Sequence, residues 1–209
     1  MKINYDIKLK EELEKIGDSK PSLLLHVCCG PCSGNVIREI ADKFKITIYY
    51  SNSNIYPREE YNRRFEELKT FLSSFNKDYN QSINVIEDPY SPKNYLEKIS
   101  VYKDEPEGGK RCYLCYQERM RQAYNYALKN NFDYWTTVLS VSPHKNSQWI
   151  NEIGDAWQSD SPKFLYADFK KNNGYLKSTQ MTKEYEMYRQ NYCGCMFSYE
   201  EMLKRESQK

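Results

Sequence analysis

The chain has 209 residues, of which 39% are hydrophobic and 29% charged, and its formal net charge at pH 7 is +2. Charges run along the whole length, and no stretch approaches the roughly 18 consecutive apolar residues of a membrane span. Composition therefore excludes a disordered tail protein and a helical membrane protein. The small basic excess does not by itself indicate a nucleic-acid-binding protein.

The first residues carry charges every few positions and lack the apolar core of a secretory signal, so we expect a cytoplasmic protein. Seven cysteines cannot all pair within one chain. In a reducing compartment, that many cysteines favour metal binding or redox chemistry over structural disulfides.

Apolar periodicity predicts strands that alternate with helices, after an N-terminal helical appendage at 1–20. Such alternation favours one α/β domain over 1–209, with a core at 21–203 and a mainly parallel sheet covered by helices on both faces. In chain order we predict a helix within 2–16, strand 22–29, helix 36–44, strand 45–52, helix 58–75, strand 83–87, helix 90–100, helix 114–131, strand 132–140, helix 147–159, strand 163–169 and helix 182–190.

The first cysteine motif is HVCCGPC at residues 26–32, where a buried strand gives way to a helix. Ligands bind at such carboxyl ends of strands in open α/β sheets. Adjacent side chains of a strand point to opposite faces, so Cys28 and Cys29 can share a metal only if the chain turns between them. The following Gly-Pro allows such a turn. His26 lies within the apolar strand and is interpreted as a core residue.

The second motif, CYLC, opens a long predicted helix, and its spacing puts Cys112 and Cys115 on one side of the first turn. The helix N-terminus favours thiolates there, and Lys110 and Arg111 add positive charge. One CxxC is equally compatible with zinc or a redox dithiol. Together, the two motifs offer the four thiolates of a [4Fe-4S] cluster or a structural zinc, and zinc would leave three cysteines unexplained.

The third motif, CGC, places Cys193 and Cys195 after the last predicted helix. A disulfide between them would close a tight, strained ring that is easily reduced, which suits a catalytic dithiol. The same two thiols suit an additional metal ion equally well. Asp168 in ADFKKNNG can serve as an oxygen ligand or proton donor, although a carboxylate at a strand end is more ordinarily solvated. His144 in SPHKN is interpreted as an exposed loop residue.

Basic residues occur in groups, each of which is most simply a solvated face. If the groups converge around the cysteine edge of the sheet, they would contact the phosphates of an RNA loop. The candidates are Arg58, Arg63, Arg64, Lys110, Arg111, Arg119, Arg121, Lys170, Lys171 and Arg189.

Six segments across residues 23–197 together resemble one known family. They are, in order, LHVCCGPCSG, SNSNIYPREEYNRR, EGGKRCYLCYQERM, TTVLSVSPHKN, ADFKKNNGY and YRQNYCGC. This set is similar to the non-cobalamin epoxyqueuosine reductases of the QueH type, which complete the modified base queuosine in tRNA. The resemblance implies a Rossmann-like fold related to the HUP and PP-loop group. The ATP-binding SGGxDS signature is absent, so ATP use is not expected.

The resemblance also implies a set of cofactor ligands. Matching family positions assign a [4Fe-4S] cluster to Cys28, Cys29, Cys112 and Cys115, and a redox-active pair to Cys193 and Cys195. Cys32 is then left over, although geometry equally allows Cys29 and Cys32 to point together. The family is also able to place a second iron beside the cluster, and the candidates for its ligands are Cys32, Cys193, Cys195 and Asp168.

The implied reaction removes the epoxide oxygen of epoxyqueuosine at the tRNA wobble position, using two electrons and two protons from an unidentified donor. An open iron site would bind that oxygen as a Lewis acid, and the Cys193–Cys195 pair would supply or store the second electron. The anticodon loop is single-stranded, so its target base can enter a pocket and stack on tyrosines. Two alternatives stay open: an iron-sulfur tRNA sulfur transferase and a zinc-stabilised RNA-binding module.

Overall fold

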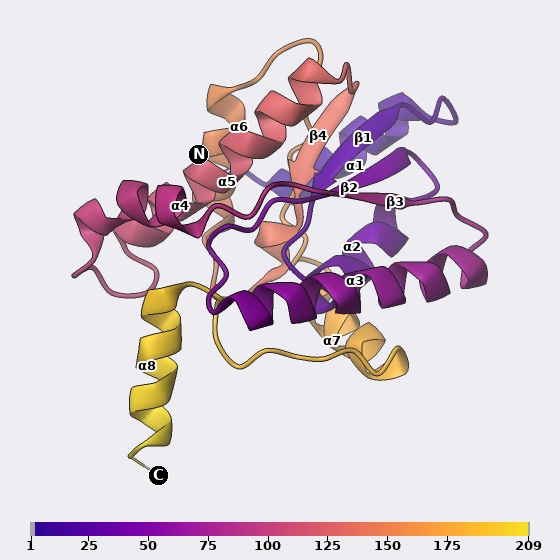
Figure 1. Cartoon of the computed structure of the whole chain (residues 1–209). Coiled ribbons are helices and arrows are strands. Elements are labelled where there is room, and N and C mark those ends of the chain that lie inside the picture. The colour runs from indigo at the N-terminus through magenta and orange to yellow at the C-terminus, as the bar shows by residue number, and fades with distance from the viewer. Residues whose placement is uncertain (1–2, 209) are drawn as a thin grey trace.

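Five parallel strands form the centre of the computed structural model, which describes residues 3–208 (Figure 1). The sheet order is β3-β2-β1-β4-β5, so the direction of winding reverses between β1 and β4. Doubly wound sheets have this order, and they bind ligands outside the carboxyl ends of the strands at the reversal. The strands are β1 Ser22–His26, β2 Lys45–Tyr50, β3 Asn84–Glu87, β4 Tyr134–Thr137 and β5 Lys163–Phe164.

Helices cover both faces of this sheet, which confirms the predicted α/β architecture (Figure 1). Helices α2, α3 and α7 pack together on one side, and α5 and α6 pack together on the other. No helix in the described residues combines the length and the apolar character needed to cross a bilayer. The helices are α1 Tyr5–Ile16, α2 Gly30–Ile40, α3 Arg58–Asp78, α4 Pro92–Ile99, α5 Lys110–Lys129, α6 Ser147–Ala156, α7 Gly174–Glu184 and α8 Met196–Glu206.

The central strand β1 is buried on both faces, as expected for a parallel strand between helix layers. His26 ends this strand without exposed surface, and its ring Nδ1 lies 2.8 Å from Thr137 Oγ1 of β4. Its Nε2 donates to the carbonyl oxygen of Ser51 at 3.2 Å. Burial, followed by the nearby Arg119, lowers the pKa of His26 to about 3. The interpretation of His26 as a neutral core residue is confirmed.

The N-terminal helix α1 packs onto the body of the domain instead of standing apart. Leu9 is buried within the hydrophobic core, and the Tyr5 ring stacks on Tyr166 at 6.1 Å between centroids. Glu12 accepts a hydrogen bond from Tyr134 Oη at 2.7 Å. The predicted domain covers 1–209 and the first predicted helix lies within 2–16, but residues 1, 2 and 209 lie outside the described residues.

Five predicted elements differ clearly from the structure. The helix predicted over 36–44 begins and ends earlier, as α2, because the helix starts directly at the Gly-Pro of the turn. The predicted helix 182–190 is wrong over 185–190, because α7 spans Gly174–Glu184 and Glu186, two residues later, adopts a left-handed backbone with φ +50°. Helix α8 had not been predicted. The strand predicted over 163–169 is reduced to β5, because the chain leaves the sheet after two residues. The strands predicted over 22–29 and 132–140 end earlier, at β1 and β4, because the chain turns at each carboxyl end.

Candidate active site

Three cysteine sulfurs gather in the turn that joins β1 to α2. Cys29 precedes the first residue of α2 in an extended conformation, with φ −171°. The Sγ atoms of Cys28 and Cys29 lie 3.7 Å apart, and those of Cys28, Cys29 and Cys32 all lie within 4.8 Å of one another. The turn that lets adjacent cysteines share a metal is therefore present, and Cys32 joins the same group.

Glycine at position 30 lets the following chain approach this turn closely. A Cβ atom on Gly30 would lie 2.9 Å from Met187 Sδ, which packs on the turn from the segment after α7. In the same segment, the Gln190 side-chain amide Nε2 donates to Cys29 Sγ at 3.3 Å. The segment that leads to the third cysteine motif is thus in direct contact with the first motif.

Hydrogen bonds make the ionisation of the three clustered thiols interdependent. Hydrogen bonds from the Cys29 and Cys32 thiols lower the pKa of Cys28 well below its usual range, and Arg119 and Lys145 act in the same direction. The Cys28 thiolate in turn raises the pKa of Cys29 to about 12 and also raises that of Cys32. Cys28 is therefore the most readily ionised of three adjacent sulfurs, and such a group suits a cation that binds sulfur.

Cys112 and Cys115 begin α5 and remain outside this group. The backbone N–H of Gly108 donates to Cys112 Sγ at 3.2 Å, which is the favourable contact expected at a helix start. Burial nevertheless raises the pKa of Cys112 to about 12, and it also raises the pKa of Cys115. The Gly108 contact thus acts in the direction expected at a helix start, and burial opposes it with the larger effect.

The third motif is a tight turn held by a buried arginine. Gly194 has φ +126°, and a Cβ atom there would lie 2.9 Å from Arg64 Nη1. Arg64 Nη1 donates to the carbonyl oxygen of Cys193 at 3.2 Å, and Glu60 pairs with the same guanidinium at 2.7 Å. Cys193 and Cys195 are both free thiols, and burial raises the pKa of Cys195 to about 11.

Two cations lie between the cysteine motifs. Arg119 of α5 is only 4% exposed, donates to Asn52 Oδ1 at 2.7 Å, and has an Nε atom without a partner. Burial alone would lower the pKa of Arg119, but Cys115 and Cys28 raise it. Burial likewise opposes the charge of Lys145, whose pKa Cys193, Cys28 and Cys32 raise. Each cation is close to cysteines of two different motifs, so all three motifs face one region.

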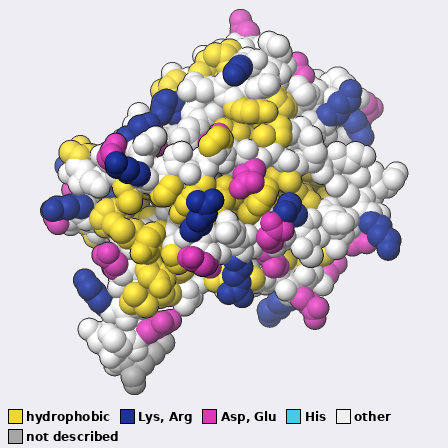
Figure 2. Space-filling model, in the orientation of Figure 1, with side chains coloured by type: hydrophobic (Ala, Val, Ile, Leu, Met, Phe, Trp, Pro, Cys, Tyr) yellow, Lys and Arg dark blue, Asp and Glu magenta, His cyan; other side chains and the backbone are white. Residues whose placement is uncertain are grey.

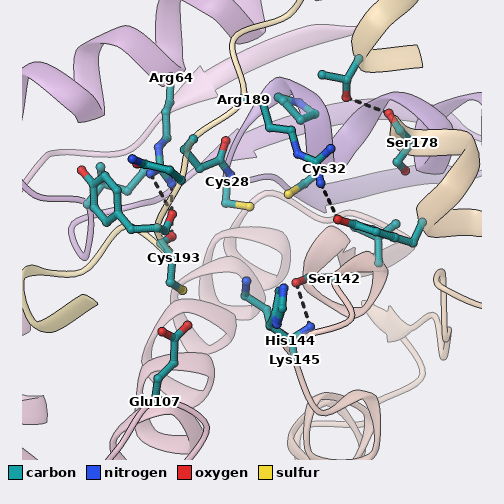
Figure 3. Close-up of a pocket in the computed structure, with 18 of the residues that line it drawn as sticks. Cys28, Cys32, Arg64, Glu107, Ser142, His144, Lys145, Ser178, Arg189 and Cys193 are labelled. Atoms are coloured by element: carbon teal, nitrogen blue, oxygen red, sulfur yellow. Dashed lines mark hydrogen bonds between the residues drawn. The ribbon is translucent and has the colours of Figure 1, made fainter. Parts of the chain in front are cut away.

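That region opens into a cavity of about 520 Å³ beyond the carboxyl end of β1. Figure 3 shows the sulfurs of Cys28 and Cys32 pointing toward each other, with Cys193 on another wall and Lys145 nearby. His144 also lines the cavity and is exposed in its loop, as its sequence context indicated.

Asp168, a predicted metal ligand or proton donor, is engaged elsewhere. Its Oδ2 accepts a hydrogen bond from Ser147 Oγ at 3.0 Å, and its Oδ1 pairs with Lys170 Nζ at 3.3 Å. Lys170 also donates to the carbonyl oxygen of Lys145 at 3.1 Å. Asp168 does not line the cavity, and the structure does not bring it into the three-cysteine group.

The predicted RNA-binding cations divide into buried and exposed residues. Arg64 and Arg111 are 2% and 4% exposed, and backbone carbonyls and carboxylates occupy their guanidinium groups, so neither presents a free charge on the outer surface. On the face shown in Figure 2, basic side chains are dispersed among acidic ones instead of forming one patch. Four exposed members lie against a tyrosine ring: Arg58 on Tyr90, Arg63 on Tyr188, Lys110 on Tyr102 and Arg189 on Tyr175. Lys171 is exposed as well.

Sequence patterns did not single out Lys145, Gln190 or Asn54. Lys145 follows His144 in a short polar loop, and Gln190 lies in a segment that had been predicted to be helical. Asn54 is buried at the cavity wall, with an Oδ1 atom that has no partner. One indication that these three residues matter was present in the sequence: each lies inside a segment that also contains residues of the recognised motifs.

The comparisons with known proteins cover nearly the whole chain. A family model described as Epoxyqueuosine reductase QueH matches residues 23–201, which include all seven cysteines. This chain belongs to the QueH family. The resemblance drawn from the six sequence segments is confirmed.

Three QueH relatives illustrate the extent of the match. The Epoxyqueuosine reductase QueH of Streptococcus pyogenes serotype M1 is 41% identical over 201 residues, which cover 94% of this chain and 78% of that protein. The protein of the same name from Staphylococcus epidermidis is 39% identical and covers 94% and 85%. The Thermotoga maritima protein is 31% identical and covers 90% and 95%.

The cysteine site of this QueH protein fits a metal bound through thiolates. Three soft sulfur donors already lie within 4.8 Å of one another, in the only such donor group among the described residues. A buried cation with no carboxylate partner is costly, and the Nε atom of Arg119 lacks any partner. An anionic thiolate-metal centre would supply the missing negative charge beside Arg119 and Lys145.

Proposed function

We propose that this chain is an epoxyqueuosine reductase that removes the epoxide oxygen of epoxyqueuosine at the wobble position of tRNA. The convergence of all three cysteine motifs on the buried, uncompensated Arg119 carries the proposal, together with membership of the QueH family. Such an arrangement suits an anionic redox centre at the edge of a cavity that admits one modified base.

The proposed redox centre is a [4Fe-4S] cluster with Cys28, Cys29, Cys112 and Cys115 as ligands, beside a second iron. Cys32, Cys193, Cys195 and Asp168 are the proposed source of ligands for that iron. Cys193 and Cys195 can serve as ligands only while they are reduced, so their roles as ligands and as a disulfide exclude each other at any one moment. The 4.8 Å group supports Cys28 and Cys29 as joint ligands, and it makes Cys32 an equal candidate for either metal. When bound, these iron centres supply one-electron transfer and a Lewis-acidic site for the epoxide oxygen.

The chain's own groups complete the chemistry. Neighbouring cysteine sulfurs raise the pKa of both Arg119 and Lys145, so both side chains stay positively charged beside the cysteine motifs. Their positive charges also favour an oxygen that becomes negative as its bond to carbon breaks. Oxidation of the Cys193 and Cys195 thiols to a disulfide would release two electrons and two protons. Conversion of an epoxide to an alkene and water consumes the same number of each.

We further propose that tRNA and an electron donor are the partners. The exposed Arg58, Arg63, Lys110 and Arg189 are available to phosphates, and Lys170 lies beside the cavity. The donor restores the thiols of Cys193 and Cys195 after each turnover. A tRNA-modifying reductase with reduced thiols is expected in the cytoplasm.

Two measurements test this function. Iron, zinc and acid-labile sulfide are determined first in the protein as purified under anaerobic conditions, because zinc without sulfide would indicate the RNA-binding module. The anaerobically reconstituted protein is then incubated with a reductant and tRNA that contains epoxyqueuosine, and the nucleosides are analysed by mass spectrometry. Loss of one oxygen atom is expected. Gain of sulfur would indicate the transferase instead, and an unchanged nucleoside would contradict the reductase.

A further inference from the structure

One wall of the cavity is a polar face of α7 that takes no part in the cysteine chemistry. Tyr175, Ser178, Thr179 and Thr182 all line the cavity, and their spacing places them on one side of the helix. Met181 lies away from this face without exposed surface, and its Cε is 3.4 Å from the position of a Cβ on Gly34 in α2. Since α2 also carries Cys32, this contact fixes the polar wall relative to the clustered sulfurs.

Tyr175 and Arg189 form one unit at the open side of this wall. The Arg189 guanidinium donates a hydrogen bond to Tyr175 Oη, and its central carbon lies 5.7 Å from the ring centroid. Both residues line the cavity and both are exposed, with Tyr175 at 36%. Figure 3 shows Arg189 reaching from its segment toward the side of the cavity that holds Cys32.

Arg189 has no carboxylate partner among the described residues, in contrast to Arg64, whose guanidinium also lies near the third motif. Arg64 pairs with Glu60 at 2.7 Å, whereas within residues 3–208 no carboxylate pairs with Arg189. The hydroxyls of Thr179 and Thr182 donate to backbone carbonyls of their own helix. Ser178, only 4% exposed, is the residue of this wall whose hydroxyl has no partner.

We propose that Tyr175 and Arg189 form the platform on which the target base of the RNA stacks, with Ser178 as a hydrogen-bonding partner deeper in the wall. Phenol rings and guanidinium planes both stack on unpaired bases, and a cation favours a ligand attached to phosphates. Because Cys28 and Cys32 line the same cavity as Tyr175 and Arg189, a substituent on a base stacked there can extend through the cavity toward these sulfurs. This inference rests on the proposed function, because it identifies the ligand as a single-stranded nucleotide.

A plain phosphate contact by Arg189 is the alternative, and the two roles differ in what Tyr175 does. A phosphate contact needs the charge alone, so removal of the Tyr175 ring would have no effect on RNA affinity. Stacking needs the ring, so Tyr175→Phe is expected to bind like the original chain, whereas Tyr175→Ala is not. Leu176→Ala is the matched control, because Leu176 is the next residue of α7, is 53% exposed and does not line the cavity.

The first readout does not depend on turnover. An anticodon stem-loop with 5-iodouridine at the wobble position is bound to the reconstituted protein and irradiated, and the cross-linked peptide is identified by mass spectrometry. We expect the cross-link on Tyr175, in the tryptic peptide that covers 172–177. It should disappear in Tyr175→Ala and persist in Leu176→Ala. A cross-link only elsewhere, or one that survives Tyr175→Ala, overturns the platform.

The second readout separates this inference from the proposed function. With epoxyqueuosine-containing tRNA, Tyr175→Ala should raise KM about tenfold and leave kcat nearly unchanged, because stacking holds the substrate before and during the reaction. Wild-type KM in Tyr175→Ala would overturn the platform while deoxygenation upholds the function. A Tyr175-dependent cross-link without any deoxygenation would uphold the platform as an RNA site and reject the reductase.

Discussion

The first and third cysteine motifs both lie at the same cavity, but one is positioned by neighbouring residues in the chain and the other by contacts with a distant segment. The turn between two adjacent elements positions Cys28, Cys29 and Cys32, because the buried strand β1 ends at His26 and α2 begins at Gly30. Cys193 and Cys195 are positioned from a distance, because Arg64 of α3 holds the carbonyl oxygen of Cys193 from 129 residues away. The first group is therefore set by the local course of the chain, whereas the place of the third motif depends on contacts between segments far apart in the sequence.

The largest expected effect comes from the first motif. Cys29→Ser removes a sulfur from the centre of the 4.8 Å group, so the reconstituted protein should lose most of its iron and all measurable turnover. Iron and sulfide per chain are measured after desalting. Full iron content in this variant would show that the group is not the metal site.

Cys→Ser substitutions in the third motif should abolish turnover without removing the cluster, unlike Cys29→Ser in the first motif. Cys193→Ser and Cys195→Ser are each expected to abolish turnover, because neither variant can form the disulfide that supplies two electrons. Most of the visible cluster absorbance should remain, since the proposed cluster ligands are intact. Absorbance and nucleoside conversion are measured on the same samples. Full activity in both variants would reject the dithiol role.

Removal of Arg64 tests whether the turn depends on its distant support. Arg64→Met removes the cation paired with the buried Glu60 carboxylate and leaves it the Tyr188 hydroxyl as a neutral partner, at an expected cost of about 3–5 kcal/mol in the free energy of unfolding. Denaturation by urea measures this cost in the metal-free chain. The double variant Arg64→Met, Glu60→Leu removes the stranded charge and should recover most of the stability without recovering turnover. Turnover restored in the double variant would mean that Arg64 does not position the cysteines.

Arg119 tests whether the motifs share one electrostatic centre. Arg119→Gln removes the buried positive charge beside Cys115 and Cys28, so iron should be lost to a chelator about tenfold faster. Arg121→Gln is the matched control, because Arg121 lies on the same helix but is exposed and paired with Glu118. Equal rates of iron loss from the two variants would contradict a shared centre.

The smallest expected effect, counted per pH unit, is a pH dependence of stability that arises from His26, the last residue of β1. The pKa of His26 is about 3 in the folded chain and near 6.5 when unfolded, so below pH 6.5 only the unfolded chain gains this proton. Stability of the metal-free chain should therefore fall as pH drops from 6.5 toward 3, by at most about 1.4 kcal/mol per pH unit from this residue. Urea denaturation of His26→Gln should show a correspondingly shallower slope, and an identical slope would exclude a neutral buried imidazole.

Local patterns were sufficient to predict the alternating elements, the parallel sheet and the turn after β1, because these depend on short-range periodicity and on the Gly-Pro after Cys29. They did not predict α8 or the extended segment after α7. Lys145 and Gln190 were also missed, since Lys145 acts on Cys28 and Gln190 contacts Cys29, and both cysteines lie more than a hundred positions earlier in the chain. The burial of Arg64 was hidden in the same way, because the carbonyl oxygen of Cys193 that it binds is 129 residues away. Arg111 instead donates to backbone carbonyls only six and eight residues before it, in a loop whose course its composition did not predict.

The central claim is that cysteines from distant motifs hold iron at one open site. Anomalous diffraction from crystals of the anaerobically reconstituted protein, recorded on both sides of the iron absorption edge, tests it most directly. We predict iron within bonding distance of Cys28 and Cys29 and of at least one sulfur from α5, beside the cavity that contains Cys193. Iron at the first motif alone, or a single zinc enclosed by four cysteines, would contradict the account.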